Sequence, residues 1–146
     1  MLEGNKILSK IFIIGLDGAT FDLINKWLPV LPNISKLIKE GTSGPLKSTI
    51  PPITCPAWLC FMTGKGPGDV GVYDFNDHKV GNYNTTLVNP SRIRKFHKPI
   101  WRILSENRIK VGTFNVPFTY PPSKINGFTV TGMFTPSEES QFTYPR

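Results

Sequence analysis

An apolar run follows Lys10, extends without interruption to Leu16 and ends at Asp17-Gly18. It contains three isoleucines and a phenylalanine, so neither of its faces is polar. Runs that are apolar on both faces are typical of buried strands in parallel sheets. We therefore predict a strand over residues 10–16, which puts Asp17 at the carboxyl edge of a sheet.

After this run the spacing of apolar residues becomes helical. The pattern predicts one helix over residues 21–28, with Thr20 or Asp22 as alternative caps, and a second over residues 34–38 that stops at Gly41. Prolines separate the two segments, because proline lacks the N–H that a helix interior requires.

The middle of the chain predicts a short strand over residues 44–50 and a helix over residues 55–63. Residues 64–97 are rich in glycine, asparagine, aspartate and tyrosine and show no sustained periodicity. We predict that they form an excursion of loops and short strands over the carboxyl edge of the sheet, where functional loops of α/β proteins tend to lie.

The last part of the chain returns to regular structure. Residues 99–110 predict a helix with basic residues on one face, and residues 111–116 and 128–131 predict two more strands, with a turn at residues 120–123 between them. The helix carries an apolar stripe of Ile100, Trp101, Ile103 and Leu104. Helices that alternate with strands indicate an α/β domain with a largely parallel sheet.

Length and composition limit the classes of protein to consider. The 146 residues fit one compact domain, and 39% hydrophobic with 18% charged residues is ordinary for an ordered chain. No apolar run reaches the roughly 18 residues that a membrane-spanning helix needs, and the N-terminus lacks the order of a signal peptide. We therefore expect a cytoplasmic protein with no membrane partner.

The net charge of +7 is concentrated in one segment. Seven basic residues between Arg92 and Lys110 are opposed only by Glu106. Such a patch suits nucleic acid or an anionic substrate, but the interleaved aromatic residues and glycines of an RNA-binding motif are missing. We favour a solvated helix face over nucleic-acid binding. The two cysteines, Cys55 and Cys60, are interpreted as buried thiols rather than a redox pair.

Two residues are candidates for chemistry. Asp17 follows a predicted buried strand, where a carboxylate faces a crevice and can hold a hard or borderline cation; a plain turn or cap aspartate is the alternative. Thr54 lies just before the predicted helix, with Pro56 in the first turn, so a phosphoryl group beside it would face unpaired N–H groups. The alternative for Thr54 is a simple N-cap.

Several motifs occur in an order that resembles the phosphodiesterase and nucleotide pyrophosphatase branch of the alkaline phosphatase superfamily. They are Gly15-Leu16-Asp17-Gly18-Ala19, Thr54-x-Pro56 and Thr63-Gly64-x-x-Pro67-x-x-x-Gly71. Lys98-Pro99-Ile100-Trp101 and the stretch from Asn115 to Pro122 resemble a prokaryotic subgroup of predicted phosphohydrolases or phosphomutases. The resemblance extends from about residue 11 to residue 136 and favours the chemical roles of Asp17 and Thr54.

The resemblance implies an alkaline phosphatase-like α/β fold with helices on both faces of the sheet. Residues 1–146 would be the N-terminal part of one catalytic domain, truncated on its C-terminal side. Asp17 would bind one of two divalent metal ions, usually zinc, and Thr54 would bind the same ion and attack phosphorus. The expected substrate is a small phosphate ester such as a nucleotide, split through a phosphothreonine intermediate.

The chain departs from that family in two ways. Phe75 occupies the position of a phosphate-binding asparagine, and Asn76 beside it is the candidate to replace it. The family's further aspartate and histidine ligands lie downstream, whereas His78 and His97 stand in no ligand motif here. The second metal site therefore needs a missing C-terminal half or a partner chain.

Three functions remain open from the sequence. The first is a metal-dependent phosphodiesterase or pyrophosphatase, inactive as this chain alone. The second is a phosphomutase or phosphomonoesterase that uses the same Thr54. The third is a non-catalytic module that binds a phosphorylated ligand or a partner.

Overall fold

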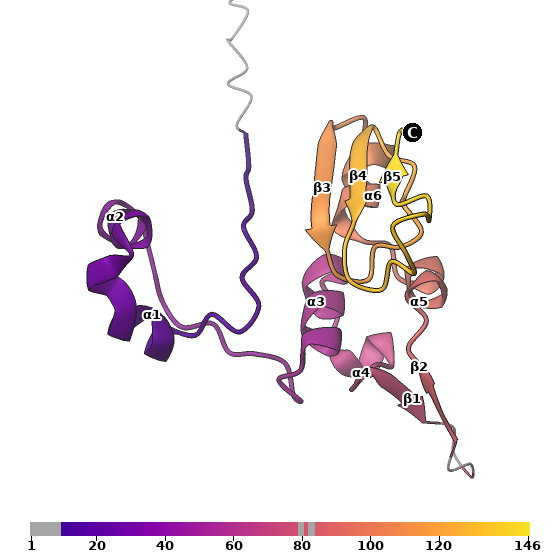
Figure 1. Cartoon of the computed structure of the whole chain (residues 1–146), viewed down its shortest axis with the longest axis horizontal. Helices are drawn as coiled ribbons and strands as arrows, with labels where there is room; N and C mark the ends of the chain where they lie inside the picture. Colours follow the sequence, from indigo (N-terminus) through magenta and orange to yellow (C-terminus); the bar gives the residue numbers. More distant parts are fainter. Residues whose placement is uncertain (1–9, 79–80, 82–83) are drawn as a thin grey trace, which may run out of the picture. The chain divides into compact units, whose positions relative to one another are not determined.

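The computed structural model describes residues 10–78, 81 and 84–146. The chain divides into two compact units, the first ending at Leu46 and the second beginning at Lys47, and each is described here by itself (Figure 1). Within the described residues, no helix is long and apolar enough to cross a membrane.

The described part of the first unit contains helices only: α1 (Phe21–Trp27), the 3-10 helix η1 (Leu28–Val30) and α2 (Pro32–Glu40). Thr20 has an extended backbone and precedes α1, Pro32 occupies the first turn of α2, and Gly41 ends that helix. These are the positions in which a capping residue, a proline and a glycine are tolerated best. Both predicted helices are confirmed, although the second begins at Pro32 rather than after it.

Two predicted strands are wrong. Residues 10–16 and 44–50 have no strand partner among the described residues, and the large apolar side chains of both segments are exposed. A strand forms only when a neighbour supplies its ladder of hydrogen bonds, and the apolar pattern of a segment cannot specify that neighbour.

The second unit has four helices within its described residues: α3 (Thr54–Thr63), α4 (Pro67–Val70), α5 (Pro90–Phe96) and α6 (Ile100–Glu106). The first two end at Gly64 and Gly71, whose backbones are left-handed with φ near +70°. Only glycine adopts that conformation freely, so these two residues fix the helix ends.

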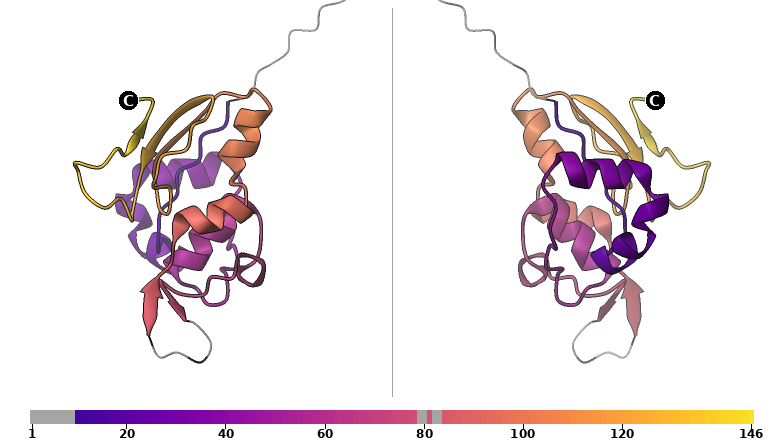
Figure 2. Two further views of the ribbon diagram at one scale, coloured as in Figure 1. Left: turned by 90° about the vertical axis from the view of Figure 1, so that its right-hand side faces the viewer. Right: turned by 90° about the vertical axis from the view of Figure 1, so that its left-hand side faces the viewer.

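Its strands form two sheets. β1 (Asn76–His78) and β2 (Thr85–Leu87) make an antiparallel ribbon that points away from the larger sheet (Figures 1 and 2). The larger sheet has the order β3 (Val111–Val116), β4 (Gly127–Thr131) and β5 (Thr143–Tyr144). β3 and β4 are parallel, and β5 is antiparallel to β4. The α/β character is therefore confirmed, and the predicted strands 111–116 and 128–131 are both present.

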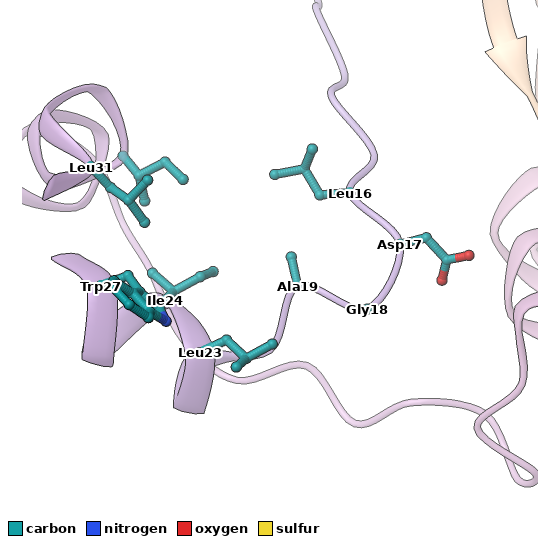
Figure 3. A pocket seen from close by; sticks show the side chains of 9 residues that line it. Leu16, Asp17, Gly18, Ala19, Leu23, Ile24, Trp27 and Leu31 are labelled. Atoms are coloured by element: carbon teal, nitrogen blue, oxygen red, sulfur yellow. The ribbon is translucent and has the colours of Figure 1, made fainter.

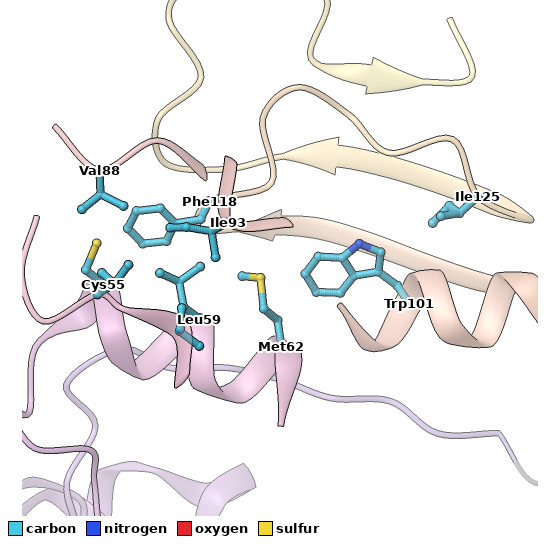
Figure 4. Packing of buried hydrophobic residues seen from close by; sticks show 10 residues of the cluster. Cys55, Leu59, Met62, Val88, Ile93, Trp101, Phe118 and Ile125 are labelled. Atoms are coloured by element: carbon cyan, nitrogen blue, oxygen red, sulfur yellow. The ribbon is translucent and has the colours of Figure 1, made fainter. Parts of the chain in front are cut away.

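The hydrophobic core of the second unit lies between the helices and one face of this sheet. Leu59 and Met62 from α3, Trp101 from α6 and Phe118 after β3 meet in it (Figure 4). On the other face Phe114 and Phe128 are 73% and 51% exposed, and the Phe128 ring lies over Gly112. Helices on both faces of a sheet, as predicted for the complete domain, are not seen in this unit.

The prediction for residues 64–97 is right in part. The two short strands are present, but α4 and α5 were expected as loops. α4 has only four residues, too few for a periodic pattern to appear. The apolar stripe of α6 is also only partly correct, because Trp101 is buried while Ile100 and Ile103 are each 46% exposed.

Candidate active site

Thr54 is the first residue of α3, and Ile53, with an extended backbone, occupies the cap position that was expected for Thr54. Within the described residues the Thr54 hydroxyl makes no hydrogen bond, so it does not cap the helix. The first intrahelical hydrogen bond is donated by the Ala57 N–H to the Ile53 carbonyl. The N–H groups of Thr54 and Cys55 come before it and have no partner within the helix, and Pro56 has no N–H. The half-buried hydroxyl therefore stands at the positive end of a ten-residue helix.

The carboxyl end of β3 lies at this same end of the core. Phe118, which follows β3, packs close to Cys55 at the start of α3, whereas Met62 from the far end of the helix lies toward Trp101 (Figure 4). Ligands of α/β proteins bind beyond the carboxyl ends of parallel strands. Thr54 is thus on the side of this unit where a ligand is expected.

Asp17 belongs to the first unit. It sits in a turn with Gly18, whose φ is +72°, and the Thr20 N–H donates to the Gly18 carbonyl at 3.0 Å. Figure 3 shows the Asp17 carboxylate pointing away from the apolar side chains of the groove that it borders. That groove has a volume of about 390 Å³ and is lined by Leu16, Asp17, Gly18, Ala19, Leu23, Ile24, Trp27, Leu31 and Ile34. The carboxylate is exposed, so it is free to meet a cation.

Because Asp17 and Thr54 belong to different units, their convergence on one metal ion stays a prediction. Within residues 10–78, 81 and 84–146, no group of three or more histidine, cysteine, aspartate or glutamate side chains is arranged to hold a metal ion. Neither unit contains a complete metal site in its described part.

Phe75 and Asn76 differ in their surroundings. Phe75 is half-buried and stacks on Phe134 with 6.1 Å between ring centroids, and Phe134 in turn lies 4.6 Å from Phe118. Asn76 is exposed at the start of β1, opposite Leu87. Phe75 is therefore part of an aromatic stack. Asn76 beside it stays the predicted replacement for the phosphate-binding asparagine.

Asp74 is a residue that the sequence did not single out. Its carboxylate accepts a hydrogen bond from the Phe75 N–H at 2.6 Å and borders a pocket of about 220 Å³ together with Asn76 and Asp77. Burial and, to a smaller extent, the charge of Asp74 raise the pKa of the Cys55 thiol to about 12. Asp74 therefore lies close enough to the start of α3 to influence Cys55. In the sequence nothing marks this residue apart from its position in the segment after α4.

The cysteines differ in burial: Cys55 is buried as predicted, whereas Cys60 is only partly buried. His97 follows α5 and is half-buried with its Nδ1 unpartnered among the described residues; the side chain of His78 lies outside the described part. Cys55 is buried, and burial followed by the charge of Asp69 raises the pKa of the Cys60 thiol. Neither thiol is a reactive thiolate at neutral pH.

Three bases of the basic segment have partners within the protein. The Arg94 guanidinium is buried, which lowers its pKa to about 10, and it donates to the carbonyls of Tyr120 and Pro121 at 2.6 and 3.1 Å. Lys98 and Arg102 both pair with Glu106. The side chains of Lys98 and Arg102 remain about half exposed in these pairs, and Lys95 is exposed as well.

Comparison with known proteins adds two findings. The profile of a family described as type I phosphodiesterase / nucleotide pyrophosphatase matches residues 11–144. A bovine protein, "Ectonucleotide pyrophosphatase/phosphodiesterase family member 3", is 28% identical over 115 residues, which cover 75% of this chain and 13% of that protein. The chain thus spans about an eighth of the length of this relative. No solved structure matches.

Proposed function

The chain belongs to the type I phosphodiesterase/nucleotide pyrophosphatase family, and on that premise we propose that it forms part of a metal-dependent hydrolase of phosphodiester or pyrophosphate bonds. The observation that carries the proposal is the Thr54 hydroxyl at the start of α3, which makes no hydrogen bond to any described residue and lies next to Cys55 at the end of the core where Phe118 packs.

Thr54 is proposed as the nucleophile. Its hydroxyl loses its proton to solvent and Oγ attacks phosphorus. The bond between phosphorus and the leaving oxygen breaks, and the leaving group departs with the electron pair and takes up a proton from solvent. The phosphothreonine is then hydrolysed by water, which restores the hydroxyl. The unpaired N–H groups of Thr54 and Cys55 stabilise the phosphoryl oxygens as negative charge increases on them.

Asp17 and Thr54 are proposed as ligands of one divalent ion, with zinc as the expected ion. An exposed carboxylate and a hydroxyl oxygen free of internal partners are oxygen donors of the kind that bind such ions. When bound, the metal lowers the pKa of the threonine hydroxyl and neutralises phosphoryl charge. The exposure of the Asp17 carboxylate away from its own apolar groove supports this role.

The proposed substrate is a small phosphate ester, with nucleotides as the first class to test, because the bovine relative is named for nucleotide pyrophosphatase activity. Asn76 is retained as a proposed substrate contact, supported by its exposure next to the Phe75 position. The complete domain is proposed to have an alkaline phosphatase-like, largely parallel sheet, of which β3 and β4 are one pair.

Further metal ligands are proposed to come from a longer chain or from a partner chain. The absence of a suitable histidine, cysteine, aspartate and glutamate group within the described residues supports this view. The same observation favours one alternative, in which this chain only binds a phosphorylated ligand or a partner.

Hydrolysis of bis(p-nitrophenyl) phosphate tests the proposal, both with this chain and with a longer protein that carries it. In the longer protein, Thr54→Ala should lower kcat by roughly three orders of magnitude or more, and a chelator should do the same. Thr63→Ala is the matched control, because that hydroxyl lies at the other end of α3 and donates to the Leu59 carbonyl.

This 146-residue chain alone should show no turnover even with added zinc. Activity of Thr54→Ala equal to that of the unaltered protein would remove Thr54 from the mechanism. Binding of phosphate with no turnover in any longer protein would favour the non-catalytic alternative.

A further inference from the structure

A β-bulge interrupts the ladder at the carboxyl end of β3. Phe114 pairs with Val130 and Val116 pairs with Thr131, so Asn115 between them is left without a partner in the ladder. Its φ is +54°, in the left-handed region. Bulges of this kind redirect a side chain and occur often beside active sites.

The bulge is fixed by the loop that follows β4. A Cβ on Gly132 would lie 2.7 Å from the Asn115 carbonyl carbon and oxygen and from the Val116 carbonyl oxygen, so only glycine fits there. The buried Thr119 hydroxyl donates to the Val116 carbonyl at 2.6 Å and accepts from the Gly132 N–H at 3.1 Å. The two loops are thus held together on both sides of the bulge.

Further contacts make this end of the sheet rigid. The Phe118 N–H donates to the Met133 carbonyl at 3.2 Å, and the Thr135 hydroxyl donates to the Gly132 carbonyl at 2.7 Å. Phe118 and Phe134 also have positive φ values, of 63° and 76°. Non-glycine residues in this conformation persist only where the surrounding structure holds them, and they gather at functional sites.

The Asn115 side chain is a free polar group on this rigid frame. Asn115 is exposed, and within the described residues its amide makes no hydrogen bond. Asparagine tolerates the left-handed conformation, which alone could explain its presence. An amide at this position also offers donors and an acceptor to a ligand without any net charge.

The position relative to Thr54 suggests which part of a ligand it meets. Phe118 packs near Cys55, the residue after Thr54. Asn115 lies three positions before Phe118, and that stretch of chain reaches about 10 Å at most. Asn115 therefore lies at the carboxyl end of β3, on the same side of the unit as Thr54 but farther along the strand from it. A group in that place is suited to the organic part of a phosphate ester rather than to phosphorus itself.

We propose that Asn115 is a specificity residue that hydrogen-bonds a hydroxyl or carbonyl group in the organic part of the substrate, next to the phosphoryl site. This inference rests on the proposed function, since it takes the Thr54 end of the core as the site of phosphoryl transfer. The loop of residues 132–135 packs against the backbone of Asn115 and so fixes the bulge from which the amide projects.

The test compares two substrates in a longer protein that carries this chain. The p-nitrophenyl ester of thymidine 5′-monophosphate offers one sugar hydroxyl and two base carbonyls, whereas bis(p-nitrophenyl) phosphate offers neither group. Asn115→Gly keeps the left-handed backbone and removes the amide, and Asn115→Asp keeps the shape but replaces the donor with a charge. Both variants should lose about tenfold in kcat/KM for the nucleotide ester and stay within about twofold for the diaryl ester.

Asn107→Gly is the control for loss of an exposed asparagine elsewhere, and thermal unfolding of each variant separates lost contacts from lost stability. Equal kcat/KM of the Asn115 variants and the unaltered protein for both substrates would overturn the inference and give Asn115 a purely conformational role. Equal losses for both substrates would also overturn it, because the amide would then act on the phosphoryl group. Either result leaves the proposed function standing if diaryl turnover still depends on Thr54.

Discussion

The two units of the chain each carry one proposed ligand of the metal ion, yet different interactions hold them in shape. In the first unit no helix contains a buried residue, and α1 and α2 have seven and nine residues. Helices of this length are marginal in water without packing. Their ends are set by local signals, such as Pro32 at the first turn and Gly41 at the end.

The second unit depends on packing. Cys55, Leu59, Met62 and Phe118 are 0% exposed, and they tie α3 to the loop after β3. The comparison shows that short-range signals can specify a helix without a core, whereas the placement of Thr54 rests on contacts between distant parts of the sequence. Substitutions in the two units should therefore differ in cost.

The largest difference is expected between two leucines on helices. Leu59→Ala in α3 should lower the free energy of unfolding by about 2–5 kcal/mol, because the side chain is fully buried. Leu37→Ala in α2 is the matched control; that side chain is 68% exposed, and its loss should cost no more than about 0.5 kcal/mol. Urea unfolding followed by circular dichroism measures both, and similar costs would show that the first unit is also held by packing.

The second effect concerns the buried Arg94, which no carboxylate pairs with among the described residues. Its guanidinium donates to two carbonyls and to the Ser123 hydroxyl, and so fixes the turn at residues 120–123. Arg94→Met leaves those acceptors without donors and should lower the free energy of unfolding by about 1–3 kcal/mol.

Arg94→Lys, which keeps the charge but has no planar fork, should fall between the unaltered protein and Arg94→Met. Lys95→Met on the exposed neighbouring position controls for loss of a positive charge. A more stable Arg94→Met protein would mean that the cost of burying the charge exceeds the value of its hydrogen bonds.

The sequence predicted the elements that depend on local signals. Helices were found where proline and glycine mark their ends, as at Gly41 and Gly64, and β3 was found from its β-branched residues. The predicted strand at residues 10–16 failed because an apolar pattern does not state which strand lies beside it. The stripe of α6 failed at Ile103, which is 46% exposed while Trp101 is buried, because an apolar stripe does not state how much of it the core will cover.

For the site, the sequence could identify residue types but not their partners. Thr54 was singled out by its motif, and its place one residue inside the helix follows from the extended backbone of Ile53. Asp74 was missed because its proximity to Cys55 arises from the fold of the segment after α4. The bulge at Asn115 was also beyond sequence reasoning, since it depends on Gly132, which comes from another strand end.

Alkaline pH should weaken the second unit through Cys55. Burial raises the pKa of this thiol from 9.0 to about 12, so the folded protein keeps a proton that the unfolded chain loses above pH 9. The contribution of this thiol to the free energy of unfolding is fully present below pH 9 and is lost as pH rises through about 12. Between these two values the free energy of unfolding falls by roughly 1 kcal/mol per pH unit.

From pH 9 to pH 10, the free energy of unfolding of Cys55→Ala should therefore fall less than that of the unaltered protein. Cys60→Ala, at a partly exposed position, should follow the unaltered protein more closely. The slope of unfolding free energy against pH is the quantity to compare, since each substitution also changes packing. Parallel slopes for all three proteins would show that the Cys55 thiol ionises in the folded state as easily as in the unfolded chain.

The smallest expected effect uses two glycines with the same backbone and different surroundings in the chain. Gly18 and Gly71 have φ values of +72° and +71°, and a Cβ at either would meet no atom within 4 Å. Alanine at both sites therefore meets only the intrinsic cost of the left-handed conformation, about 1 kcal/mol. Gly71→Ala should remove that amount from the stability of the second unit, because Gly71 ends α4 next to the buried Val70.

Gly18→Ala should leave urea unfolding of the second unit unchanged. Fluorescence measures this unfolding in a protein whose Trp27 is replaced by phenylalanine, so that only Trp58 and Trp101 report. If Gly18→Ala also lowered that stability, the turn that carries Asp17 would be coupled to the core that carries Thr54, and the contrast between the two units would no longer hold.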